Sequence, residues 1–306
     1  MQTAPWHQKL WHVLRKTVGA AFDYRITGMS AEAAFFAILS LPPLIFGLAG
    51  SVGFIARRFD PEAIVTFRDQ VLTLAGRAFQ PDVVDSIVAP TLDEVLFTGR
   101  FEFVSVGFLI ALWSGSRVVN VFIDTITITY GMAGERGVVR QRALSVGAYV
   151  VFITLGMVLF PLVLAGPDII SALLPASMDW LTALYWPVVL IASVALMATI
   201  YHLAVPIRHR WSDDLPGAAL AVLWWVVGSA LLRMFLGYSV GSTSIYGPLS
   251  APIAVLLWLY LMSMAILVGA ALNAAFAEVF GITGTPLAQT VSEKQVRRDA
   301  DDSPAT

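Results

Sequence analysis

Six apolar stretches, each long enough to cross a lipid bilayer, constrain this chain more than any other feature of its sequence. A membrane-spanning helix needs about 20 mainly apolar residues, because the hydrocarbon core is about 30 Å thick. Helices satisfy their backbone polar groups internally, as hydrocarbon demands. The sequence therefore predicts an all-α polytopic membrane protein. The six predicted spans lie at residues 31–56, 101–123, 143–166, 181–205, 217–237 and 248–277.

The composition agrees with this class and excludes several others. Hydrophobic residues make up 58% of the chain and charged residues 13%, whereas a soluble domain carries about 25% charged residues. The net charge of −2 argues against a nucleic-acid partner. The absence of cysteine excludes disulfides and thiolate sites. The four histidines do not have the spacing of known metal motifs, so we expect no metal and no cofactor.

The polar segments predict how the chain is organised around the spans. Residues 1–30 have basic and apolar positions at helical spacing, which predicts a cytoplasmic amphipathic helix at the membrane interface. An ordinary juxtamembrane tail is the alternative. Residues 57–100 are too polar to cross, and we expect short helices there that cap the six-helix domain 31–278 on its extracytoplasmic side. Residues 279–306 read as a disordered cytoplasmic tail.

The orientation follows from the distribution of lysine and arginine. The loops 124–142 and 206–216 carry three and two basic residues, whereas the opposite loops, 167–180 and 238–247, carry none. The positive-inside rule places both basic loops and both termini in the cytoplasm. The five arginines of segment 57–100 are the one discordant feature.

Two consecutive prolines, Pro42 and Pro43, lie near the middle of the first span. Both lack a backbone donor, and their rings clash with the preceding turn, so we expect a helix break or kink. Non-helical backbone at membrane depth is tolerated where protein buries it or where it lines a water-filled space. The prolines therefore predict that the first span is central in the bundle.

A charged residue inside the second span is the best local indication of function. Arg117, Asn120 and Asp124 have the spacing of one helix face, and Trp113 lies one turn earlier, within reach of a cation–π contact. A cation in hydrocarbon is costly, so we interpret this stripe as an intramembrane polar site that binds anions through Arg117. Two alternatives stay open: Arg117 extends to the cytoplasmic interface as an anchor, or it pairs with a carboxylate or carbonyl.

Two further polar residues lie within the spans. Arg233 is near the outer end of the fifth span, and Asn273 is in the sixth. We expect a structural role for Arg233. We expect Asn273 to form a hydrogen bond across to a neighbouring helix, beside small residues that allow close packing.

Several short motifs occur in an order that is specific when they are taken together. They are Ala33 to Pro43, Trp113-Ser114-Gly115-Ser116-Arg117 through Tyr130-Gly131 to Glu135-Arg136, Leu215-Pro216-Gly217-Ala218, Tyr246-Gly247-Pro248-Leu249, and Leu257-Trp258-Leu259-Tyr260 to Leu272-Asn273-Ala274. With these motifs the chain resembles the YihY/virulence factor BrkB family of bacterial inner-membrane proteins, over about residues 10–278. Family members usually have a glutamate where this chain has Ala271, so the resemblance gives no support here to proton coupling through that position.

The resemblance and the residues together predict a function class. We expect a transporter-like or envelope-lipid-handling protein that accepts membrane lipids or another anionic amphiphile. The alternative is a non-transporting scaffold for envelope partners. Some family members carry the label ribonuclease BN, but a hydrolytic ribonuclease needs a metal cluster or an acid–base pair on the cytoplasmic side. The sequence shows neither, so we expect no enzymatic activity.

Overall fold

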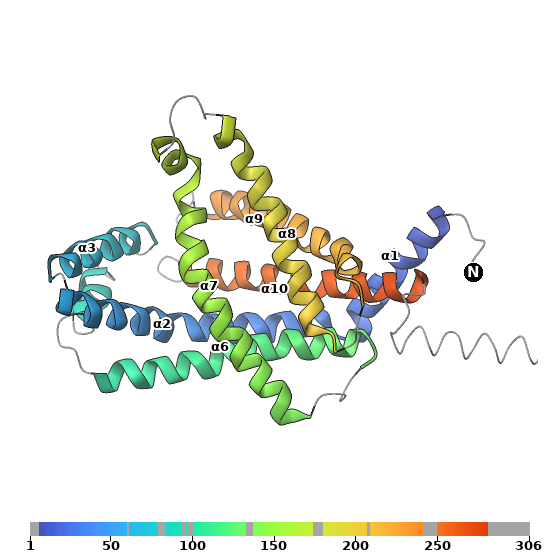
Figure 1. Ribbon diagram of the computed structural model, residues 1–306, viewed down its shortest axis with the longest axis horizontal. Coiled ribbons are helices and arrows are strands. Elements are labelled where there is room, and N and C mark those ends of the chain that lie inside the picture. Colours follow the sequence, from blue (N-terminus) through green and yellow to red (C-terminus); the bar gives the residue numbers. More distant parts are fainter. Residues whose placement is uncertain are drawn as a thin grey trace, which may run out of the picture. The chain divides into compact units, whose positions relative to one another are not determined.

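The computed structural model describes residues 6–59, 61–78, 84–93, 96, 101–132, 137–173, 180–206, 209–240 and 250–280. The regular elements in these ranges are helical, and none of them is a strand (Figure 1). They are α1 (Trp6–Asp23), α2 (Ile26–Phe59), α3 (Pro61–Ala78), η1 (Val84–Val88), α5 (Ala89–Asp93), α6 (Phe101–Thr129), α7 (Val138–Leu173), α8 (Trp180–Ala204), η4 (Trp211–Asp214), α9 (Leu215–Val240) and α10 (Ser250–Phe280).

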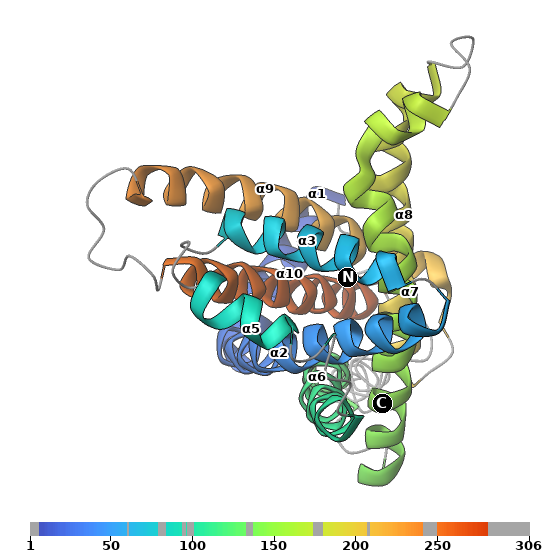
Figure 2. The ribbon, with the colours of Figure 1, turned by 90° about the vertical axis from the view of Figure 1, so that its left-hand side faces the viewer.

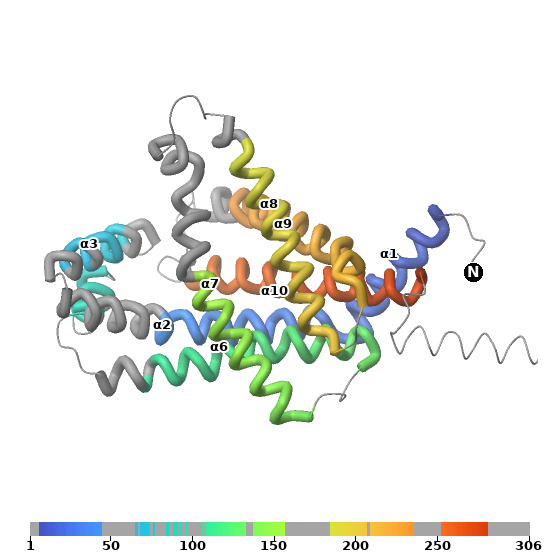
Figure 3. The backbone as a smooth tube through the Cα atoms, in the orientation of Figure 1, coloured from blue at the N-terminus to red at the C-terminus, as the bar shows by residue number. Residues whose placement is uncertain are grey.

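Six of the helical segments are long and apolar enough to cross a membrane, and each overlaps one predicted span. Their order along the chain can be followed in Figure 3. The predicted all-α polytopic fold is therefore confirmed. The candidate spans are Ile26–Leu44, Phe108–Thr129, Val138–Gly156, Leu184–Ala204, Trp211–Phe235 and Pro252–Phe280.

The N-terminal segment forms the helix α1, as its periodicity predicted. One face is buried through Val13 and Thr17, and Lys16 forms an ion pair with Glu278 of α10. A ridge of large apolar side chains, spaced four residues apart, is exposed along the helix. These exposed residues are Trp6, Leu10, Leu14, Val18 and Phe22. A ridge of this kind suits a membrane interface, and that location stays a prediction.

The chain forms two compact units. Unit 1 contains residues 1–32, 119–229 and 261–306, and unit 2 contains residues 33–118 and 230–260. In unit 2, α3, η1 and α5 occupy the segment where short helices were expected, and α3 lies beside α5 (Figure 2). Arg68 of α3 holds Asp93 of α5 through two hydrogen bonds, one of them 2.9 Å from Nη2 to Oδ2. The predicted tail beyond Phe280 lies outside the described residues.

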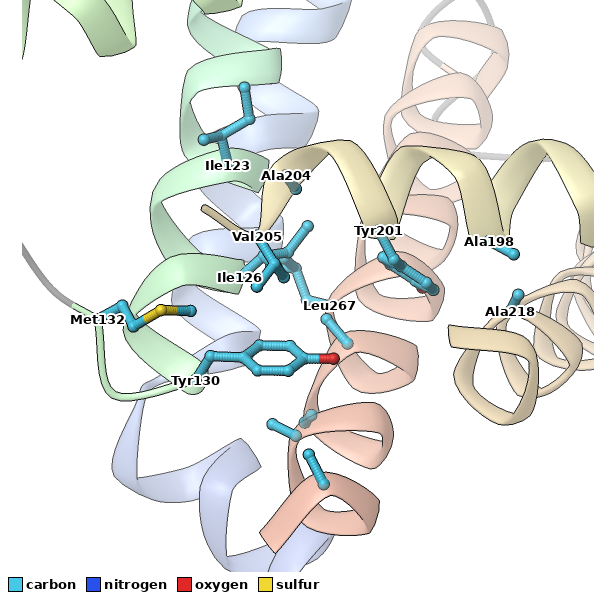
Figure 4. Packing of buried hydrophobic residues seen from close by; sticks show 14 of the residues in the cluster. Ile123, Ile126, Tyr130, Met132, Ala198, Tyr201, Ala204, Val205, Ala218 and Leu267 are labelled. Carbon is cyan, nitrogen blue, oxygen red and sulfur yellow. The ribbon is translucent and has the colours of Figure 1, made fainter. Parts of the chain in front are cut away.

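The hydrophobic core of unit 1 is built mainly from small residues, together with a few large ones (Figure 4). The ends of α6 and α8 and the start of α9 meet α10 there. The fully buried members include Ile126 of α6, Tyr201 of α8, Ala218 of α9, and Leu267 and Ala271 of α10. Small residues let helix backbones approach closely, which is the usual basis of packing in membrane helices.

Two helices of this core approach each other closely at Gly217 of α9 and Gly269 of α10. A Cβ atom added to Gly217 would lie 2.1 Å from the carbonyl oxygen of Gly269, and one added to Gly269 would lie 2.5 Å from that of Gly217. A side chain at either position would clash with the backbone of the facing helix. The packing role inferred for the small residues of the sixth span therefore holds at this crossing.

Of the helix break or kink predicted at Pro42 and Pro43, the break is wrong, and the kink stays a prediction. Helix α2 continues through both prolines from Ile26 to Phe59. The prolines remove donors to the carbonyls of Ile38 and Leu39, but the hydrogen bonds on either side keep the helix intact. The Ser40 hydroxyl donates to the Ala37 carbonyl at 2.7 Å, so this serine bonds next to the two carbonyls that lose their donors and satisfies neither of them. Pro42 is exposed, and Pro43 is partly buried.

Candidate functional site

Arg117 lies in the membrane-spanning part of α6, where it contacts an aromatic ring of α2. Its Cζ atom is 5.2 Å from the centroid of the Phe36 ring, within the range of a cation–π contact. The side chain is partly buried. Ser114 and Ser116, on the turn before it, are fully buried and donate to carbonyls of their own helix, so each of these two hydroxyls is satisfied.

The aromatic partner of Arg117 differs from the one that the sequence suggested. Helical spacing pointed to Trp113, but the ring below the guanidinium belongs to Phe36. Trp113 packs edge to face against the same Phe36, with ring centroids 6.1 Å apart, and is itself 56% exposed. The structure thus combines Arg117, Phe36 and Trp113 into one cluster of unit 2.

Asn120 and Asp124 belong to unit 1, and both bond to α7. The Ser145 hydroxyl donates to Oδ1 of Asn120 at 3.3 Å, and Nε2 of Gln141 donates to Oδ1 of Asp124 at 3.3 Å. Ser145 is fully buried, whereas Asp124 is exposed. These bonds hold α6 against α7. A ligand-binding role for the two residues stays a prediction.

The two secondary candidates lie in different surroundings. Arg233 of α9 is exposed on the surface of the chain. Asn273 of α10 is 1% exposed, and its amide bonds across to the start of α9. Its Oδ1 accepts from the Gly217 amide at 2.7 Å, and its Nδ2 donates to the Asp214 carbonyl at 3.1 Å. The interhelical hydrogen bonding that we inferred for Asn273 is therefore present.

A cluster of ionisable side chains that sequence reasoning missed lies beside Asn273. His202 near the end of α8, His209 in the following turn and Asp214, which directly precedes α9, converge in unit 1. Nε2 of His209 is 2.7 Å and Nδ1 of His202 is 3.4 Å from Oδ2 of Asp214. The two imidazole rings are 4.6 Å apart between centroids. Asp214 is fully buried, and the His209 side chain is 4% exposed.

The turn between α8 and α9 brings these residues together. A 3₁₀ turn, Trp211–Asp214, leads directly into α9. Within it, the Arg210 amide donates to Oδ2 of Asp213 at 3.1 Å, and Nε1 of Trp211 donates to the Thr199 hydroxyl of α8 at 3.2 Å. These bonds fold the turn back on α8, so that the Asp214 carboxylate meets both histidines.

Tyr130 approaches the same carboxylate from the end of α6. Gly131 has φ 75° and ends that helix with two bonds, Gly131 amide to Ile128 carbonyl at 2.8 Å and Met132 amide to Thr127 carbonyl at 3.0 Å. This arrangement is a Schellman motif, which needs a left-handed residue such as glycine. It directs Tyr130 toward α10 (Figure 4). Burial raises the pKa of Tyr130, and the carboxylates of Asp214 and Asp213 raise it further.

The cluster corrects one premise of the sequence argument. We expected no metal ligands because the histidines lack a recognisable spacing. Two imidazole nitrogens and a carboxylate oxygen nevertheless lie within 4.8 Å of one another. The cluster also supplies a possible acid–base pair, so the reason given above against hydrolytic activity does not hold. The sequence indicates this cluster only through two histidines and an aspartate that lie close together in the short polar segment between two apolar helices.

Comparisons with known proteins agree with these motifs. A family model described as "Virulence factor BrkB" matches residues 19–293. YfkH of Bacillus subtilis (strain 168), which bears a ribonuclease-like name, is 24% identical over 256 residues, covering 80% of this chain and 88% of the relative. No solved structure matches the chain. Since the family model spans most of the sequence and the six apolar helices fit it, this chain is an integral membrane protein that belongs to the virulence factor BrkB family.

Proposed function

We propose that this protein handles an anionic amphiphile, such as a lipid head group, at an intramembrane site built on Arg117. It would act as a transporter-like or envelope-lipid-handling protein of the bacterial inner membrane. The observation that supports this proposal is the position of Arg117, within the apolar segment Phe108–Thr129 and against the Phe36 ring.

The chemistry of Arg117 suits such a ligand. An arginine stays charged even where the surroundings are apolar, and its planar guanidinium binds phosphate or carboxylate oxygens in pairs. Attraction between charges is also stronger at low dielectric than in water. Phe36 and Trp113 add apolar surface for the hydrocarbon part of an amphiphile. The site thus offers a charged group and an apolar wall together.

The packing of unit 1 favours a second candidate. The start of α9 and the middle of α10 touch at Gly217 and Gly269, and the surrounding core is filled by alanine and a few larger residues. A tightly packed bundle of this kind suits a scaffold that holds envelope partners and transports nothing. A scaffold would not depend on the chemistry of the cation at position 117 beyond its charge.

The relative's name does not decide whether this chain cleaves RNA. We propose that it does not, because a chain with a net charge of −2 has no overall electrostatic attraction for RNA, and an RNA-cleavage assay with and without added Zn²⁺ tests that statement.

Lipid retention separates the first two candidates. The full chain is purified in mild detergent, and native mass spectrometry measures which lipids remain bound in Arg117→Ala, Arg117→Lys and the wild type. Arg233→Ala is the matched control, because Arg233 is an exposed arginine of another membrane-spanning helix. We expect anionic lipid on the wild type and on Arg233→Ala, less on Arg117→Lys, and none above background on Arg117→Ala.

Equal retention in all four proteins would contradict the Arg117 site. Uptake of a fluorescent anionic lipid into proteoliposomes then tests transport. Retention at Arg117 without any movement of the lipid would favour the scaffold.

A further inference from the structure

We propose that His202, His209 and Asp214 bind a divalent transition-metal ion of the zinc type at the turn between α8 and α9. This inference goes beyond the function proposed for Arg117 and does not depend on it. It begins with the convergence of three ligand atoms from residues that are seven and five positions apart in sequence.

The separations of these atoms suit a metal. Zinc bonds of about 2.0–2.2 Å in a tetrahedron bring ligand atoms to about 3.3–3.5 Å from one another. Nδ1 of His202 is already 3.4 Å from Oδ2 of Asp214. Nε2 of His209, at 2.7 Å from the same oxygen, needs a shift of roughly half an ångström, which small side-chain rotations supply. All three atoms lie within 4.8 Å of one another.

The second observation is a pair of buried polar atoms without hydrogen bonds. Within the described part of the chain, Oδ1 of Asp214 and Nδ1 of His202 have no partner in hydrogen-bond geometry. The Tyr130 hydroxyl is close enough for the carboxylate to affect its pKa, but it does not meet that geometry with Oδ1. Oδ2 of Asp214 is bonded to His209, but a fully buried carboxylate oxygen without a partner, such as Oδ1, still costs free energy. A bound cation would compensate it.

The surroundings hold the carboxylate in place before any metal arrives. The Asp214 carbonyl accepts a hydrogen bond from Asn273, whose Oδ1 is in turn fixed by the Gly217 amide. The backbone of Asp214 is therefore tied to α10. Groups outside the ligand set that fix its orientation are a regular part of protein metal sites. The His202 side chain is 34% exposed, so an ion has a way in from that side.

The donor set indicates which metal fits. Two imidazoles and one carboxylate suit Zn²⁺ and its first-row neighbours, whereas Mg²⁺ and Ca²⁺ prefer oxygen ligands throughout. Three protein ligands leave one position of a zinc tetrahedron open. In proteins such an open position holds water or a substrate, unlike a closed structural site with four protein ligands.

A metal-free reading uses the same residues. A hydrogen bond between Nε2 of His209 and the Asp214 carboxylate is charge-assisted and would close the turn without a metal. This reading needs only one of the two histidines and gives the partly exposed His202 no role. Variants of His202 therefore separate the two readings better than variants of His209.

The experiment measures Zn²⁺ binding by the full chain in detergent, purified through an affinity tag that contains no histidine. Elemental analysis after dialysis gives the stoichiometry, and calorimetric titration with ZnCl₂ gives the affinity. The variants are His202→Ala and Asp214→Asn. The control is His12→Ala, because His12 is an exposed histidine of α1 outside the cluster. Elution volume and melting temperature monitor folding.

We expect one Zn²⁺ per chain in the wild type and in His12→Ala. His202→Ala should bind at least about tenfold more weakly, since removal of a ligand costs more than the 10–100-fold typical of a supporting residue. Substitution with Co²⁺ should give the visible absorption bands of a four-coordinate ion. If Asp214→Asn fails to fold, His202→Ala still decides the question, because its side chain is partly exposed.

The proposal is overturned if the wild type binds no Zn²⁺ above the level of a protein-free control. It is also overturned if folded His202→Ala binds Zn²⁺ as tightly as the wild type does.

Discussion

The backbone amide of Gly217 donates a 2.7 Å hydrogen bond to the side-chain oxygen of Asn273, two residues that are 56 positions apart in sequence. The same asparagine also holds the carbonyl of Asp214. Gly217 follows Pro216 in the first turn of α9, where backbone amides have no partner inside the helix. Asn273 therefore satisfies the first turn of α9 from α10, in a place where water would otherwise be needed.

Replacement of Gly217 by alanine should destabilise the protein strongly. The new Cβ would lie 2.1 Å from the Gly269 carbonyl oxygen and 2.5 Å from Asn273 Cγ. Backbone atoms cannot move aside cheaply, so we expect a loss of about 3 kcal/mol or more. Thermal unfolding in detergent, followed by tryptophan fluorescence, measures it. The control is Gly147→Ala in α7, where a Cβ would meet nothing within 4 Å. An unchanged melting temperature for Gly217→Ala would contradict the close crossing.

Asn273→Ala should also destabilise the protein, by about 1–3 kcal/mol, because a buried donor and a buried acceptor both lose their partner. Asn273→Asp keeps an acceptor for the Gly217 amide and loses the donor to Asp214, so it separates the two bonds. Denaturant or thermal unfolding gives the free-energy differences. Thr154→Ala is the control, because the exposed Thr154 hydroxyl bonds only to the Val150 carbonyl of its own helix. Equal stability of Asn273→Ala and Thr154→Ala would refute the bridging role.

Acid should loosen the pairing of α3 with α5. The hydrogen bonds from the Arg68 guanidinium lower the pKa of Asp93 below its usual value. A group whose pKa is depressed on folding stabilises the fold above its unfolded pKa, about 4, and this contribution is lost as the pH falls through the folded pKa. Hydrogen exchange in α3 and α5, corrected for its intrinsic pH dependence, should rise below pH ~4.

Asp93→Asn should show the faster exchange already at neutral pH. The control is Asp85→Asn, since Asp85 is exposed in the same region. If neither acid nor Asp93→Asn changes exchange in α3, the ion pair does not hold these two helices together.

Reporter fusions test the orientation of the chain, which rests on the basic loops. A reporter active only in the periplasm should give no signal when fused after Gly281, because the positive-inside rule places the C-terminus in the cytoplasm. The same reporter inserted between α7 and α8, within residues 174–179 of a segment without lysine or arginine, should be active. The opposite pattern would reverse the topology and place the His202 cluster on the outer side.

The spans could be predicted from the sequence because a bilayer imposes a length and an apolar composition that are read directly from the residues. The bonding of Asn273 was predictable for a related reason, since a lone amide in hydrocarbon needs a partner. The helix through Pro42 and Pro43 was not predicted. Proline removes its own donor locally, whereas the continuity of α2 depends on the neighbouring bonds and on the low dielectric that strengthens them.

Two features could not be predicted from the sequence because tertiary structure determines them. They are the aromatic partner of Arg117 and the cluster of His202, His209 and Asp214. Helical spacing gives only the neighbours of Arg117 on its own helix, whereas Phe36 comes from another helix. His202, His209 and Asp214 meet because the turn after α8 folds back, and no periodicity encodes that turn. The composition of the segment, polar and bounded by apolar spans, indicated a loop but not the direction of its side chains.

The contact between Gly217 and Gly269 has a mechanical consequence. With backbones this close, α9 and α10 cannot slide or roll past each other at the crossing without a steric clash, and the Asn273 bonds fasten them further. In any rocking movement of the protein, the start of α9 and the middle of α10 must therefore move together as one rigid body. Asp214, which directly precedes α9, would move with these two helix segments, so an ion held there would move with them.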